Sequence, residues 1–100
     1  MAVTKKKARK ILSNCPPQES FWVNNGPIIK NLSELYRELK LMNPETFKHH
    51  VSKDRNDFSK WIKDCLRDST LASELKKTTG KKTTVTKLRT RLAMLKKVAR

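Results

Sequence analysis

The sequence predicts an all-α protein: a compact bundle of four to five short helices with an extended aromatic N-terminal arm and basic termini. Three observations predict this class. Apolar residues recur at intervals of three and four along several segments, which is the spacing that lines one face of a helix. The chain has 100 residues, enough for one domain with one small core. Two glycines and four prolines are too few for a linker-like or collagenous chain.

The first two helices are predicted on either side of an Asn-Pro pair. In the segment 31–42 the apolar residues step by three and four, and Asn31 with Glu34 three residues later is a plausible capping pair. Asn43 and Pro44 then end this helix and begin a short second one, because Asn caps orphan amides and Pro is tolerated in a first turn. The second helix is expected to continue through Phe47 and His50 to Val51.

The strongest helical periodicity lies in the segment 57–67. Its apolar residues stand at offsets 0, 3, 4, 7 and 8, and they are Phe58, Trp61, Ile62, Cys65 and Leu66. Asp68 and Ser69 can cap a further helix that ends near Gly80, a residue suited to a left-handed helix terminus.

The last predicted helix begins at Thr83 or Thr84 and carries an unbroken apolar stripe. The stripe consists of Val85, Leu88, Leu92, Leu95 and Ala99. About fifteen residues give a helix of roughly 22 Å. At about 100° per residue, Arg89, Lys96 and Arg100 lie along one shoulder of the stripe. Lys87 and Arg91 lie toward the other shoulder, so this helix can dock through leucines and present cations outward.

The segment 21–29 is predicted to be extended. Phe21 and Trp22 precede an Asn-Asn-Gly-Pro run that Ile28 and Ile29 follow, a pattern that indicates either a loop or a small two-stranded hairpin. We expect this aromatic arm to pack across the helices, with its aromatic pair filling the core rather than stacking on bases.

Charge is distributed very unevenly along the chain. Lys and Arg number 24 against nine Asp and Glu, a formal net charge of +15. All of this excess lies in the acid-free segments 1–10 and 76–100, since residues 11–75 carry nine basic and nine acidic side chains. We therefore divide the chain into a basic flexible N-terminal arm (1–14), a neutral helical body (15–80) and a basic amphipathic C-terminal helix packed on the body (81–100).

This segregation indicates a polyanionic partner, because phosphate backbones attract clustered Lys and Arg. The candidate nucleic-acid-binding residues are Lys5, Lys6, Lys7, Arg9, Lys10, Lys76, Lys77, Lys81, Lys82, Lys87, Arg89, Arg91, Lys96, Lys97 and Arg100. The last helix has no Asn or Gln to read base edges, so we expect sequence-independent DNA binding of the chromosome-associated type. RNA or ribosome binding stays open, as does a different class, a protein-interaction module that docks an acidic partner. The stepping of the last helix permits a homodimer but does not require one.

Several other classes are disfavoured. No run of about 18 apolar residues is present for a membrane span, and the apolar core of a secretory signal is missing after Leu12. We expect a protein of the cytoplasm or nucleoid, not of membranes, with two reduced thiols. No carboxylate pair, activated nucleophile, glycine-rich cradle or metal-ligand spacing is present. We therefore expect no enzyme activity, cofactor or metal, and His50 is interpreted as a hydrogen-bonded, partly buried residue.

The middle of the chain resembles a small prokaryotic family. The resemblance rests on Phe-Trp-Val-Asn-Asn-Gly from Phe21, Asn-Leu-x-Glu-Leu from Asn31, His50-Val51, Arg-Asn-Asp-Phe-x-x-Trp-Ile from Arg55, and Leu71-Ala72, all within residues 16 to 78. The family is mainly archaeal and is classed as a domain of unknown function, so the resemblance implies no activity. Its familiar members have a more acidic, mixed-charge surface, and the acid-free ends of this chain depart from that pattern.

Overall fold

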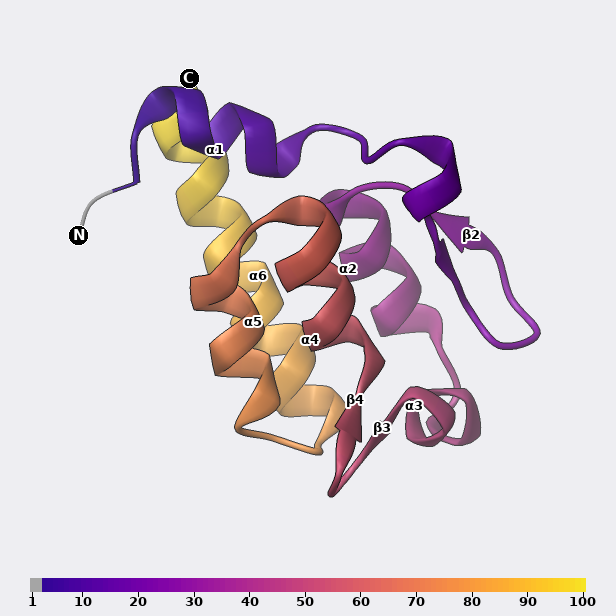
Figure 1. Ribbon diagram of the computed structural model, residues 1–100. Helices are drawn as coiled ribbons and strands as arrows, with labels where there is room; N and C mark the ends of the chain where they lie inside the picture. The colour runs from indigo at the N-terminus through magenta and orange to yellow at the C-terminus, as the bar shows by residue number, and fades with distance from the viewer. Residues whose placement is uncertain (1–2) are drawn as a thin grey trace.

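The computed structural model of the protein describes residues 3–100 and places six α-helices in that range (Figure 1). The helices are α1 (Lys5–Leu12), α2 (Leu32–Leu41), α3 (Pro44–His50), α4 (Asp57–Trp61), α5 (Ser69–Lys76) and α6 (Lys81–Ala99). The short elements are a 3-10 turn η1 (Pro17–Glu19), a π-helical turn η2 (Ile62–Leu66), and the strands β1 (Phe21–Trp22), β2 (Ile28–Ile29), β3 (Val51–Ser52) and β4 (Arg55–Asn56). The fold is mostly helical, with principal extents of 36 × 27 × 22 Å.

Side-chain caps set several helix boundaries where the sequence predicts them. Asn31 accepts a hydrogen bond from the backbone N–H of Glu34, and Asn43 does the same for Thr46. Asp68 caps α5 by accepting from the N–H of Leu71. These local contacts satisfy N–H groups that have no partner within their helix.

The N-terminal segment differs from the expected flexible arm, because residues Lys5–Leu12 form helix α1 and pack on the body. Thr4 caps this helix by accepting from the N–H of Lys7 at 3.1 Å. Ala8 and Ile11, one turn apart, are 0% and 1% exposed. An isolated helix of eight residues is not stable in water, so the burial of these two side chains is what stabilises α1.

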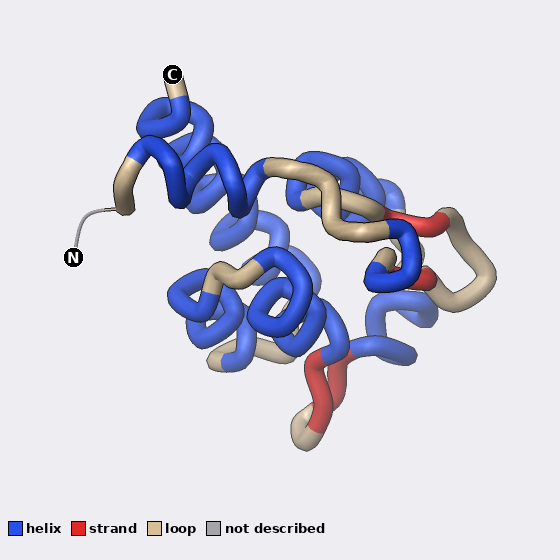
Figure 2. Tube along the Cα trace, turned by 45° about the horizontal axis from the view of Figure 1, so that its top comes forward, coloured by secondary structure: helices blue, strands red, loops and turns tan. Residues whose placement is uncertain are grey.

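The protein is not strictly all-α, because two small antiparallel hairpins interrupt the helices (Figure 2). Phe21 pairs with Ile29 and Trp22 with Ile28, so of the two alternatives predicted for this segment the two-stranded hairpin is the one that forms. Asn25 adopts a left-handed conformation in its turn, which Asn tolerates better than most residues. The second hairpin, β3–β4, was not predicted. The expected helix through Val51 ends at His50, because Val51 is extended and buried.

Helix α6 is the longest element and contacts α1, α2 and α5. It begins at Lys81, two or three residues before the predicted start at Thr83 or Thr84. The hydroxyl of Thr84 is buried and donates to the carbonyl of Gly80 at 2.8 Å, and Gly80, at the N-cap position, has no side chain to accept from the first N–H groups. Leu88, Leu92 and Leu95 are buried in the core that all six helices share. Among the helices of residues 3–100, none combines the length and the hydropathy that a membrane span requires.

Candidate nucleic-acid interface

Helix α1 lies across the C-terminal end of α6, which brings the two acid-free ends of the chain together (Figure 1). The guanidinium Nε of Arg9 donates to the carbonyl of Ala99 at 2.8 Å, so a basic side chain satisfies one of the last carbonyls of α6. Buried Ala8 and Ile11 anchor α1 to the core. Two segments more than 80 residues apart in sequence therefore form a single surface.

We call this surface the cationic end. Its members are the exposed basic side chains of α1 and of the last turn of α6, namely Lys5, Lys6, Lys7, Arg9, Lys10, Lys96, Lys97 and Arg100. None of these eight residues forms an ion pair within residues 3–100. Their charges are therefore available to an external anion.

Two predicted binding lysines are instead held by Glu74. Its carboxylate accepts from Nζ of Lys77 at 3.2 Å and lies 3.4 Å from Nζ of Lys87, and Lys87 also donates to the carbonyl of Glu74 at 3.1 Å. The hydrogen bond from Lys77, and then that from Lys87, lower the pKa of Glu74. One carboxylate thus offsets part of the charge that the sequence assigned to binding.

Arg91 is likewise paired with a carboxylate of the body. Its Nε and one terminal nitrogen each donate to Asp68 at 2.9 Å, and Asp68 is only 2% exposed. The pair joins the start of α5 to α6, and bidentate geometry makes such a contact specific. The shoulder of α6 with Lys87 and Arg91 therefore faces α5, whereas the shoulder with Arg89 is exposed.

The remaining predicted residues lie away from the cationic end. Lys81 donates through Nζ to the carbonyl of Met42, and Lys82 is exposed beside it at the start of α6. Lys76 is exposed at the end of α5. Figure 1 shows the start of α6 and the end of α5 at the opposite end of the helices from α1. The fifteen candidates therefore do not form one site.

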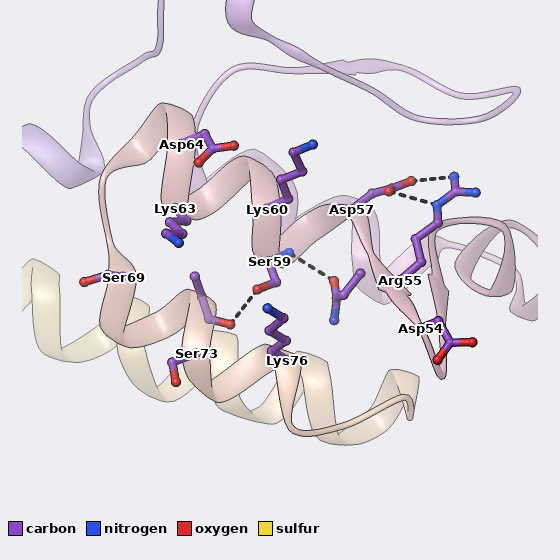
Figure 3. Close-up of a pocket in the computed structure, with 12 residues that line it drawn as sticks. Asp54, Arg55, Asp57, Ser59, Lys60, Lys63, Asp64, Ser69, Ser73 and Lys76 are labelled. Atoms are coloured by element: carbon purple, nitrogen blue, oxygen red, sulfur yellow. Dashed lines mark hydrogen bonds and ion pairs between the residues drawn. The ribbon is translucent and has the colours of Figure 1, made fainter.

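Lys76 lines a groove of about 730 Å³ between α4–η2 and α5 (Figure 3). Two polar residues at its base are used in the fold: Asn56 donates to the carbonyl of Leu75 at 3.1 Å, and Ser59 to that of Ala72 at 2.6 Å. Lys60 points away from α5, whereas Lys76 reaches toward Ser59. Asp54, Asp57 and Asp64 also line the groove, so its charge is mixed and does not favour a polyanion.

His50 and Asp57 form a structural hydrogen-bonded chain. The buried ring of His50 accepts through Nε2 from the N–H of Asn24 at 3.0 Å, so Nδ1 carries the proton and donates to Asp57 at 2.9 Å. Arg55 donates to both carboxylate oxygens of Asp57, and these bonds, with a smaller effect of His50, hold the pKa of Asp57 below its usual value. The prediction of a hydrogen-bonded His50 is confirmed, and both of its nitrogens are occupied.

The thiols and carboxylates are dispersed. Within residues 3–100 no group of three His, Cys, Asp or Glu side chains could hold a metal ion. Cys15 is buried, Cys65 is partly buried, and both are free thiols. Burial raises the pKa of the Cys65 thiol, which disfavours its thiolate form.

Trp22 and Arg67 differ from the expectations drawn from sequence. Phe21 is buried against Phe58 as expected, but Trp22 is 72% exposed. Arg67 was not predicted as a binding residue, yet it lies beside the lysines of α1. Candidates were taken from the acid-free ends, and Arg67 lies in the segment 11–75, whose net charge is zero. The available signal was its position between a helix and the Asp68 cap, where a left-handed residue is common.

The structure defines a small helical domain whose one end is strongly cationic. The chain belongs to a family of unknown function, DUF5752, whose model matches residues 17–97. The match covers α2 to α5 and almost all of α6, and α1 lies before it. No curated protein and no solved structure matches the chain.

Proposed function

We propose that the protein binds DNA without sequence specificity through the cationic end, as a chromosome-associated protein of the nucleoid. The observation that carries the proposal is the packing of α1 on the last turns of α6, which gathers eight exposed cations that have no acidic partner among residues 3–100. Neutralising phosphates with such groups releases condensed counterions, and this release drives sequence-independent binding.

The types of side chain favour contacts to the phosphate backbone over base reading. Six of the eight residues of the cationic end are lysines, which act as point charges, and residues 81–100 contain no Asn or Gln. The segments 3–12 and 81–100 also contain no aromatic residue on which an unpaired base could stack. Exposed Trp22 lies on the β1–β2 hairpin, at the far side of the molecule from α1 (Figure 1). These features favour duplex DNA over single-stranded RNA.

Salt dependence tests the proposal. Fluorescence anisotropy would follow binding to two DNA duplexes of unrelated sequence between about 50 and 300 mM salt. Six to eight phosphate contacts predict a slope of log K against log salt of about −5 to −7, equal for the two sequences. Failure to bind either DNA duplex at the lowest salt would overturn the proposal.

A matched pair of triple variants localises the surface. Replacing Lys6, Lys10 and Lys96 by Gln is expected to reduce the magnitude of the slope by about 2.7, since each contact contributes about 0.9. The control replaces three exposed lysines of the body, and they are Lys30, Lys48 and Lys53. Both variants lose three positive charges. Equal losses of affinity would therefore show that binding depends on the net charge of the protein and not on the cationic end.

The alternative of an acidic protein partner has its own outcome. A flexible polyglutamate chain carries carboxylates without the dense phosphate charge of a duplex. If the protein bound polyglutamate as tightly as DNA at equal salt, the interaction-module hypothesis would replace the DNA-binding one. We expect much weaker binding to polyglutamate, because duplex DNA presents one charge about every 1.7 Å.

A further inference from the structure

Arg67 occupies a backbone conformation that other residues adopt more readily. Its φ and ψ are 64° and 31°, in the left-handed region, where it follows the π-helical turn η2. Its N–H donates to the carbonyl of Ile62, and the next residue, Asp68, is the N-cap of α5. Glycine adopts this conformation without a steric penalty, and Asn tolerates it better than Arg. The backbone alone therefore gives no reason for a long cationic side chain here.

The surroundings of Arg67 supply such a reason. Together with Lys6, Lys7 and Lys10 of α1 it lines a hollow of about 380 Å³, whose other lining residues are Thr4 and Ile11. No acidic residue lines this hollow. The nearest carboxylate in sequence, that of Asp68, is buried and occupied by Arg91. Four cations thus face one space without a counter-charge, an arrangement that an anion would stabilise.

We propose that Arg67, Lys6, Lys7 and Lys10 form a phosphate-binding subsite that takes a phosphodiester of the nucleic-acid backbone. This inference rests on the DNA-binding function proposed above and adds a residue of the body to the cationic end. The guanidinium group is planar and contacts two phosphate oxygens at once, whereas the lysines add charge without fixed geometry. Arg67 therefore fixes where the backbone lies on the domain, between α1 and the start of α5.

Because Arg67 has a left-handed backbone conformation, substitutions there can distinguish a role in binding from a role in stability. Replacing Arg67→Gly or Arg67→Asn removes the charge and relieves the backbone, so the melting temperature is expected to stay equal or rise. Affinity for duplex DNA at about 100 mM salt is expected to fall about fivefold to tenfold, and the slope to lose about 0.9 in magnitude. Arg67→Lys keeps the charge and is expected to retain the slope with a smaller loss of affinity.

The control is Arg37→Gln, which removes an exposed cation from α2, in the body. If Arg67→Asn weakened binding no more than Arg37→Gln, the subsite would be refuted while the DNA-binding function stood. If the Arg67 variants melted at a clearly lower temperature, the side chain would serve the fold and the proposal would fail. Absence of binding by the unmodified protein would instead contradict the proposed function itself.

A last experiment distinguishes binding of a phosphate in a nucleic-acid chain from binding of free phosphate. Inorganic phosphate would be titrated into the protein at constant ionic strength, and the chemical shifts of the Arg67 side chain followed. We expect saturating shifts with duplex DNA at concentrations where inorganic phosphate causes little change, because one anion lacks the neighbouring contacts of a polymer. Equal saturation by inorganic phosphate would overturn the assignment to nucleic acid.

Discussion

The docking of α1 can be tested by a substitution that changes no charge, Ile11→Ala. Ile11 is 1% exposed and is one of the largest fully buried side chains. The substitution removes three carbon atoms, worth about 0.8 kcal/mol each in transfer free energy. A residual cavity adds to this cost, and buried Ile→Ala changes span about 2–5 kcal/mol. We expect the free energy of unfolding to fall by about 3 kcal/mol.

Urea denaturation followed by far-ultraviolet circular dichroism would measure this change. Tryptophan fluorescence gives a second probe, because Trp61 is buried and its Nε1 donates to the carbonyl of Glu19 at 2.7 Å. The control is Lys6→Ala, an exposed position on the same helix, which is expected to change the free energy of unfolding by less than about 0.5 kcal/mol.

The same variant bears on function. If α1 leaves the core, its cations are no longer held beside those of α6, and affinity for DNA falls although the net charge is unchanged. A cost of less than about 0.5 kcal/mol for Ile11→Ala, equal to that of Lys6→Ala, would refute the reasoning. It would mean that the N-terminal segment is a free arm and that the cationic end does not exist as described.

Asp57, Arg91 and Trp22 each give a further prediction, from an ion pair or from the exposure of the side chain. Because the pKa of Asp57 is depressed in the folded state, its contribution is present above the usual carboxyl pKa of about 3.9 and is lost as pH falls through the lower folded value. Asp57→Asn should reduce this loss in urea midpoints measured from neutral to acidic pH, and an unchanged acid response would contradict it. Arg91→Met leaves the buried carboxylate of Asp68 unpaired and should cost about 3–5 kcal/mol in urea unfolding, whereas exposed Arg89→Met should cost little. Trp22→Ser should change thermal stability by less than about 0.5 kcal/mol, since a larger loss would place that ring in the core.

Elements with a strong local signal could be predicted well. Asn31, Asn43 and Asp68 cap their helices because a short polar side chain reaches an amide three residues away, a contact that depends only on nearby sequence. The apolar stripe of α6 could also be predicted from local sequence, because its spacing matches the period of the helix. The Asn-Gly turn pointed to the β1–β2 hairpin as one of two alternatives, but the β3–β4 hairpin was missed, because two-residue strands carry no period.

The order of charged residues along the sequence by itself determined that the excess charge belongs to the two ends of the chain, and local spacing determined most helices. Only the tertiary structure decided which cations act together. It placed α1 on α6, gave Lys87 and Arg91 carboxylate partners, and brought Arg67 from the neutral body to the lysines of α1. Charges interact through distance in space, and packing of apolar side chains far apart in sequence sets that distance.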